Sequence, residues 1–524
     1  MSERIYMLTK EQNNQCAYNH FKFYIIIAFI LFNIANIKVK AEKIPQHFLL
    51  SQNFFPTKSV EKKDSNENGI EHLDATSYKY TFSLEEAVNF ALKSNRDIIS
   101  QQESLQNSKL SLNSAETEFE ISIIPSGDVG FSDSDDEANQ ARYKGEISFS
   151  KKLPHGSLVT INPAIHRSFS DDSDTDHQTS INLSLVQPLF RGISREYNLS
   201  AIHSAEYNVR SAYRNLHMTR IDTIIQTVNA VYEIIKQEEL VKIYWESADR
   251  LKGFADTARI KKEIGMAEPE DVYRANQKYK QAQDILISSQ EALKNAKDNL
   301  KIILNIPIKD DIEVKAPFVI ENVEISEEDA IRITFENRIE LEEAEDFLRE
   351  KYRISRISKE NTLPDFNVNF SYSWLGNDEQ FERSMSLHQN RWSIGFTTTT
   401  DFFRRSEKFA YRQSLLSIES AKRKTGLLRD NLVKQLKNEI RNLNRSAKQV
   451  ILQQSRIDEA KSQLELSRIK FKHGFANNFD LIEAETVLRS AQTNLISAMI
   501  SYIVGTYRLR AAMGTILEKP GSVP

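Results

Sequence analysis

The chain has 524 residues, and its 69 basic and 73 acidic side chains leave a formal net charge of −4. This balance gives no electrostatic basis for a nucleic-acid partner. Glycine and proline number only 15 and 12, which indicates few turns and long uninterrupted elements. The composition therefore favours long helices over a series of small, turn-rich domains.

The first 41 residues have the features of an export signal peptide. Basic and polar residues precede an apolar run at 21–34, and Ala41 supplies a small residue at a cleavage point. A membrane anchor is the alternative, although the run is short for a spanning helix. The single cysteine, Cys16, precedes the apolar run and would leave with the signal. The mature chain would then carry neither disulfides nor thiol chemistry.

A polar N-terminal extension is expected at 42–80, and a first repeat at 81–310. Ser83 and Glu86 have the spacing of a capping box, which opens a helix expected to reach about Glu120. The region 124–189 then favours strands. Its candidate strands are 128–131, 146–151, 158–161 and 180–186. The aspartate-rich segments between them lack the glycine and glutamate spacing of calcium loops, which favours solvated outer loops.

Two long helices complete the first repeat. Apolar residues spaced by three and four predict one helix from about Ile193 to Ile264, which would be about 100 Å long at 1.5 Å per residue. The chain reverses at 265–270, and a second helix is expected from Asp271 to Asn305. A linker is expected at 311–325.

The same order of elements recurs in a second repeat at 326–516, before a tail at 517–524. A capped helix precedes a strand hairpin at 363–403, and two long helices flank a return at 474–479. The repeated unit is much longer than the roughly 20 to 50 residues of a solenoid repeat. The chain is therefore predicted to be a duplicated helix–β-hairpin–helix unit.

The copies align residue by residue around the helix returns. Gly265 and Asp271 in the first repeat correspond to Gly474 and Asp480 in the second. Glycine suits a return because it adopts the left-handed conformation without a Cβ clash.

The hairpin at 363–403 is two-faced, because apolar residues alternate with small polar ones. Such a strand suits a barrel wall that faces lipid on one side and water on the other. The alternative is a half-buried hairpin of a soluble sheet. The residues expected to face lipid are Phe366, Val368, Phe370, Tyr372, Trp374, Trp392, Ile394 and Phe396.

A sheet inside hydrocarbon cannot leave an edge open, and the smallest bacterial barrels have about eight strands. One chain with a few such strands cannot close a barrel alone. Several copies would share one, and their long helices would close into a second, helical tube beneath it.

With these features, the chain resembles the TolC-like outer-membrane efflux proteins over nearly the whole mature region. The matching segments are SLEEAVNFALKSNRDI at 83, SLVQPLFRG at 184, ENRIELEEAE at 336, LPDF at 363, GMAEPEDVYRANQKYKQAQ at 265 and GFANNFDLIEAETVLRSAQTNL at 474. The resemblance implies a mainly α homotrimer with a shared twelve-stranded outer-membrane β-barrel above a periplasmic α-barrel of coiled-coil helices. It implies four strands per chain, so two of the four candidates at 124–189 are expected to form an added hairpin outside the barrel.

The resemblance also implies roles for the helix returns. A periplasmic adaptor protein would dock at Ile264, Gly265, Met266, His473, Gly474 and Phe475. Asp480 and Glu483 would ring the pore axis as a constriction, with Asp271 in an inter-helix contact at the tip. The plainer interpretations are turn glycines and acids that favour a helix dipole. The tyrosine and arginine that often close the family's tip are replaced here by Phe471 and Ala476.

The predicted function is a passive duct that extends from the bacterial outer membrane into the periplasm. An inner-membrane RND or ABC transporter and the adaptor would deliver substrates for efflux or type I secretion. No enzyme motif, cofactor site or metal site is identified, and the ten histidines are scattered. The alternative is a periplasm-spanning coiled-coil scaffold or adhesin that does not conduct.

Overall fold

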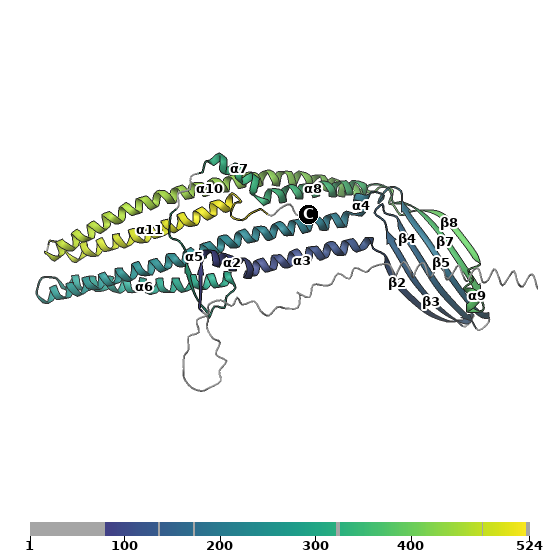
Figure 1. The fold of residues 1–524 in the computed structure, drawn as a ribbon, viewed down its shortest axis with the longest axis horizontal. Coiled ribbons are helices and arrows are strands. Elements are labelled where there is room, and N and C mark those ends of the chain that lie inside the picture. Colours follow the sequence, from purple (N-terminus) through teal and green to yellow (C-terminus); the bar gives the residue numbers. More distant parts are fainter. Residues whose placement is uncertain (1–78, 135–136, 171–172, 321–324, 474, 520–524) are drawn as a thin grey trace, which may run out of the picture. The chain divides into compact units, whose positions relative to one another are not determined.

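The computed structural model describes residues 79–134, 137–170, 173–320, 325–473 and 475–519 (Figure 1). The expected signal peptide, most of the N-terminal extension, Gly474 and the end of the tail lie outside these ranges. The chain divides into two compact units, which are described separately. The described residues of the sheet unit lie within 112–205 and 352–416, and those of the helical unit lie within 79–111, 206–351 and 417–519.

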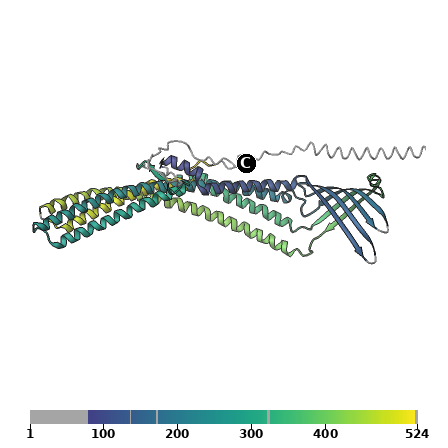
Figure 2. The same cartoon turned by 90° about the horizontal axis from the view of Figure 1, so that it is seen from below.

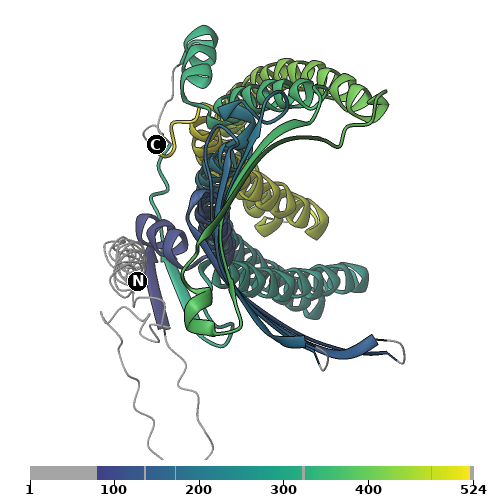
Figure 3. The same cartoon turned by 90° about the vertical axis from the view of Figure 1, so that its right-hand side faces the viewer.

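The sheet unit contains one antiparallel sheet of six strands in the order β2-β3-β4-β5-β7-β8. Figure 3 shows it as a curved strip. The hairpin of the second repeat continues the strands of the first, because β7 pairs with β5. The strands are β2 (Ser122–Ser134), β3 (Glu137–Lys152), β4 (Leu158–Ser170), β5 (Ser173–Pro188), β7 (Phe366–Asp378) and β8 (Gln389–Thr398).

All four candidate strands of the first repeat are strands, and each is longer than the sequence indicated. The expectation that two of them stand apart as an added hairpin is wrong, because β3 pairs with β4 along most of its length. The chain therefore forms a sheet of six strands and not the expected four. The resemblance gave the wrong strand number because the quoted segments that match the family do not include the region that forms β2, β3 and β4.

The register gives the sheet one apolar and one polar face. Phe370 on β7 is opposite Leu185 on β5 and Ile394 on β8, and register partners point to the same side. On the other side, the hydroxyls of Ser371 and Ser393 lie 2.7 Å apart. Trp392, Ile394 and Phe396 are 66%, 58% and 65% exposed, so no described part of the chain covers the apolar face of β8. The expected two-faced hairpin is thus present in the structure.

The helical unit is built from four long helical segments that lie side by side (Figure 2). They are α5 (Ser200–Glu263), α6 (Pro269–Leu304), α10 (Arg405–Lys472) and α11 (Asn478–Ala512). The bounds of α5 and α6 agree with the expected helices to within a few residues, except that α5 begins after a separate short helix, α4 (Arg195–Asn198). The helices α10 and α11 flank the second return, as expected. Among the described residues, no helix is both long and apolar enough to cross a membrane.

Each repeat opens with an 11-residue helix, a break and a second helix. In the first repeat these are α2 (Leu84–Ser94) and α3 (Arg96–Glu116), and in the second α7 (Glu327–Asn337) and α8 (Ile339–Glu360). The single long helix expected from Ser83 to Glu120 is therefore wrong. Asn95 adopts an extended conformation, and its side-chain amide donates to the carbonyl oxygen of Ile303 at 2.9 Å. The side-chain oxygen of Asn95 accepts from the amides of Asp97 and Ile98, so capping of the following helix outweighs the helix propensity of this stretch.

The segment expected as a linker at 311–325 begins with a strand, β6 (Asp311–Lys315). It pairs in parallel with β1 (Lys79–Ser83), which begins within the predicted N-terminal extension. Ile312 and Val314 alternate with charged residues and pack into the main core with Leu300 and Leu304 of α6. Five alternating residues are too few for a strand signal to stand out from a linker.

Candidate functional site at the two helix returns

The first return joins α5 to α6 through a left-handed glycine. Gly265 has φ +72°, and the amide of Met266 donates to the carbonyl oxygen of Lys261 at 2.7 Å. This is the bond that closes a Schellman-type helix end. A Cβ at Gly265 would meet nothing within 4 Å. Glycine is needed here for its backbone conformation and not for space.

The second return repeats this hydrogen bond at the equivalent place. The amide of Phe475 donates to the carbonyl oxygen of Lys470 at 2.9 Å. The helix that follows, α11, opens with a capping box in which Asn477 and Asp480 accept from each other's backbone amides at 3.1 and 3.2 Å. The duplicated sequence therefore gives duplicated turns, although Gly474 itself lies outside the described residues.

The described residues proposed for adaptor docking are exposed and mostly apolar. Ile264, Met266 and Phe475 are 64%, 68% and 83% exposed, and His473 is exposed beside them. Exposed apolar side chains gathered on helix returns are typical of a surface that another protein covers.

The acidic residues proposed for the constriction occupy the first turns of α6 and α11. Asp480 and Glu483 are exposed on one side of α11, and Asp480 is also the capping-box partner of Asn477. The capping contact shows that Asp480 stabilises the start of α11, and this is compatible with the proposed role of its charge in the pore constriction. The backbone oxygen of Asp271 accepts a hydrogen bond from the side-chain amide of Asn478 at 3.2 Å. That bond joins the two returns, and it uses the main chain rather than the carboxylate of Asp271.

A lysine that the sequence did not single out also connects the returns. The Lys261 ammonium donates to the carbonyl oxygen of Phe471 at 2.5 Å and lies 3.8 Å from the centre of its ring. Phe471 is buried, so this cation–π contact is partly shielded from water. A hollow of about 430 Å³ lies between the returns and is lined by Lys261, Asp271, Phe471 and Asp480 among others. Phe471 is one of the two positions where the expected tyrosine and arginine are replaced, and it joins α10 to α5 through its contact with Lys261.

A second missed contact, between Arg250 and Glu485, lies farther along the same helices. The guanidinium of Arg250 on α5 donates to both oxygens of Glu485 on α11, at 2.7 and 3.0 Å. Glu485 is only 1% exposed. Glu485 lies one helical turn after Leu481 on the buried face of α11. A charged residue at a position where the helical spacing predicts an apolar one was the sequence signal that could have identified this contact.

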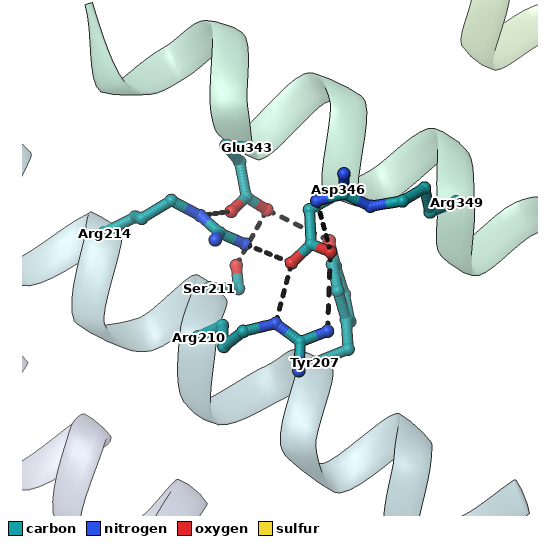
Figure 4. Close-up of polar contacts among 7 residues, drawn as sticks. All are labelled: Tyr207, Arg210, Ser211, Arg214, Glu343, Asp346 and Arg349. Carbon is teal, nitrogen blue, oxygen red and sulfur yellow. Dashed lines mark hydrogen bonds and ion pairs between the residues drawn. The ribbon is translucent and has the colours of Figure 1, made fainter. Parts of the chain in front are cut away.

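Another polar cluster joins the first repeat to the second within the helical unit. Figure 4 shows its seven residues, which are Tyr207, Arg210, Ser211 and Arg214 on α5 and Glu343, Asp346 and Arg349 on α8. Arg214 bridges the two acids, donating to Glu343 at 2.5 Å and to Asp346 at 2.7 Å. Arg210 donates to Asp346 at 3.1 Å.

The cluster is buried at its centre, where the side chains of Arg214 and Asp346 are 8% and 5% exposed. Burial alone would raise the pKa of Asp346, but hydrogen bonds from Arg210 and Arg214 outweigh it and lower the pKa below its ordinary value. Burial, with Glu343 nearby, raises the pKa of Tyr207 to about 12. Asp346 therefore stays ionised at neutral pH, and its ion pairs join α5 to α8. Within the described residues, no group of three or more histidine, cysteine or acidic side chains could hold a metal ion.

Comparisons with known proteins agree with this architecture. Residues 332–515 match the family model described as outer membrane efflux protein. The outer membrane protein TolC of Vibrio cholerae is 21% identical in an alignment of 334 residues that covers 61% of this chain and 74% of that protein. The outer membrane protein TolC of Salmonella enteritidis is 19% identical in an alignment of 363 residues that covers 66% of this chain and 70% of that protein.

Solved structures share the fold along most of the chain. The outer-membrane channel OprN superposes with a TM-score of 0.65 at 13% identity, over 82% of this chain and 89% of that one. The CmeC outer membrane channel of Campylobacter jejuni gives a TM-score of 0.63 at 13% identity, over 88% of this chain and 96% of that one.

Proposed function

We propose that this chain is a TolC-like outer membrane efflux protein and that three copies of it form a passive duct of a tripartite export machine. The observation that carries the proposal is the pairing of two features in one chain. The sheet has one apolar and one polar face, as a membrane wall around water requires, and the four long helices end in duplicated returns.

The proposal gives each part of the chain a task. The sheet unit is placed in the bacterial outer membrane with its apolar face against lipid, and the helical unit extends into the periplasm. The exposed residues around Gly265 and Gly474 receive a periplasmic adaptor, which connects the duct to an inner-membrane transporter of the RND or ABC class. The acids at the start of α11 narrow the entrance by concentrating negative charge around the axis.

The experiment that tests the function is planar-bilayer conductance of detergent-purified mature protein, with the mass of the assembly measured on the same sample. We expect trimers that give discrete openings of low conductance, because the returns close the periplasmic end at rest. A soluble, non-conducting rod would contradict the proposal and favour a periplasmic scaffold or adhesin.

Because the two faces of the sheet are assigned to lipid and to water, an arginine introduced at Ile394 and one introduced at Ser393 are expected to differ in their effect on barrel assembly. Ile394→Arg places a charge on the lipid side and is expected to destabilise the assembled barrel by about 2–4 kcal/mol per chain near the middle of the membrane. Ser393→Arg places the same charge in the water-filled lumen and is expected to assemble normally with altered ion selectivity. The measurement is the fraction of each variant recovered as heat-resistant trimer from outer membranes. Equal recovery of the two variants would contradict the assignment.

A further inference from the structure

The two outer strands of the sheet, β2 and β8, each have one open edge. Within the part of the chain that the structure describes, β2 pairs with β3 and β8 pairs with β7, and neither has a second partner. Backbone groups left unpaired along such an edge cost several kcal/mol each in hydrocarbon. If the sheet lies in a membrane, both edges require a partner strand.

The hairpin β2–β3 has the same two-faced character as the other four strands. Val129 and Phe131 on β2 are 59% and 74% exposed, and Val129 is opposite Tyr143 on β3. The register carries this apolar face through Phe149 on β3 to Ile161 on β4. This row is apolar in all six strands, because Ile123 precedes Phe149 on one side and Leu183, Tyr372 and Trp392 follow Ile161 on the other. An apolar row across every strand is the pattern of a single lipid-facing wall.

The opposite face of the hairpin is charged as well as polar. Asp128 is opposite Lys144, and the ammonium of Lys144 lies 2.6 Å from the carboxylate of Glu146 on the same strand. Charges of this kind suit the lumen of a barrel and not its lipid side. A hairpin that stood outside the wall would have no use for one mainly apolar face and one charged face.

From these observations we infer that the outer-membrane barrel of this protein has eighteen strands, six from each of three copies, closed by β2 of one copy against β8 of the next. The inference rests on the proposed trimeric duct. Strands alternate in direction along the sheet, so the first and last of an even set run antiparallel and can close the ring without a mismatch. The partner that the β2 edge fits is therefore a second copy of the same chain.

The strand number sets the width of the outer end of the duct. Barrel diameter grows roughly in proportion to strand number, so eighteen strands give a lumen about half again as wide as twelve. Barrels of 16 to 18 strands leave an open aqueous channel. The narrowest point of the duct would then lie at the helix returns. The eighteen-stranded barrel would let larger substrates pass than a twelve-stranded barrel would.

Cysteine crosslinking in intact cells tests which strands meet between copies. The chain has one native cysteine, Cys16, and a Cys16→Ser background makes each introduced pair unambiguous. Ser393→Cys on the polar face of β8 is combined in turn with cysteine at Ser122, Ile124, Ser126 or Asp128, which share that face of β2. Oxidation is expected to give covalent dimers and trimers with the β2 position that lies opposite Ser393 in the assembly.

The matched control combines Ser393→Cys with cysteine at Thr160, Asn162 or Ala164 on β4, which already has neighbours on both sides in the sheet. No crosslink between copies is expected from these pairs. A conducting trimer that crosslinks through β4, or through none of the β2 positions, would overturn the eighteen-stranded barrel and leave the duct function intact. An assembly of two copies would also overturn it. A non-conducting monomer would instead show that the proposed function itself is wrong.

Discussion

Replacing Asp346 with alanine is expected to lower the free energy of unfolding by about 3–5 kcal/mol. The substitution removes the acceptor that Arg214 and Arg210 share between α5 and α8. Arg214 is only 8% exposed, so its guanidinium would remain buried with part of its charge uncompensated. Loss of helical circular dichroism with increasing urea measures the effect, at fixed protein concentration because the assembly is proposed to be trimeric.

A double substitution separates the pair from the surrounding packing. Asp346→Leu combined with Arg214→Met replaces both charges by apolar groups, and we expect it to cost less than either single change, because neither of the two most buried charges is left without its partner. Glu343 keeps its hydrogen bonds from Tyr207 and Ser211. Asp346→Asn keeps the volume and one acceptor, and is expected to lie between wild type and Asp346→Ala. A change below about 0.5 kcal/mol for Asp346→Ala would show that these ion pairs contribute little to stability.

The same cluster predicts a dependence of stability on acid. The pKa of Asp346 in the folded protein is lower than its ordinary value of 3.8, because the hydrogen bonds from Arg210 and Arg214 outweigh the effect of burial. A lowered folded-state pKa contributes stability that is present above the unfolded pKa and is lost as pH falls through the folded pKa. We expect the difference in stability between wild type and Asp346→Asn to shrink below about pH 4. A difference that stays constant down to pH 2 would contradict this assignment.

The sequence predicted the long helices well because their signal accumulates over many residues. Apolar spacing of three and four persists along α5 and α10, which have 64 and 68 residues, and the bounds follow from the glycine returns. The short strand β6 has only five residues, and its partner β1 lies more than 200 positions away. Such a pairing depends on tertiary contacts that no local pattern records.

For the sheet, the sequence predicted the direction of the side chains but not the number of strands. Alternation along Phe366–Asp378 predicted its two faces, because side-chain direction in a strand depends only on position. The number of strands per chain depends on whether a hairpin pairs with its neighbour, which alternation does not determine. The resemblance to a family supplied the wrong number, and the pairing of β3 with β4 supplied the right one.

At the returns, the turns were predicted and the contacts between them were not. The matched positions Gly265 and Gly474 indicated two reversals, and Asp480 was identified as a candidate for the pore. The Lys261 contact with Phe471 and the Arg250 pair with Glu485 join residues from different repeats, more than 200 positions apart. Their identification required knowledge of which helix faces meet.

Replacing Asp480 with asparagine is expected to raise single-channel conductance and to weaken block by multivalent cations. In the proposed trimer, three copies of Asp480 would place a ring of carboxylates in a narrow, wet passage. Such a ring holds cations strongly enough to slow their departure, and the substitution removes that charge. Asparagine keeps a side-chain oxygen that can accept from the amide of Asn477, as Asp480 does at 3.2 Å, so the start of α11 should survive. Single-channel recordings with and without a trivalent cation measure both effects.

The cap and the charge can be separated by a second variant in the same turn. Asn477→Ala removes the cap, at a cost of about 1 kcal/mol to the helix, and leaves the carboxylate of Asp480 in place. If Asp480 acts through its charge, Asn477→Ala should keep cation block while Asp480→Asn loses it. If both variants change conductance alike, the effect comes from a loosened helix start, and Asp480 has no electrostatic role at the gate. Glu483→Gln, one turn farther along the exposed side of α11, should then decide whether any acid narrows the entrance.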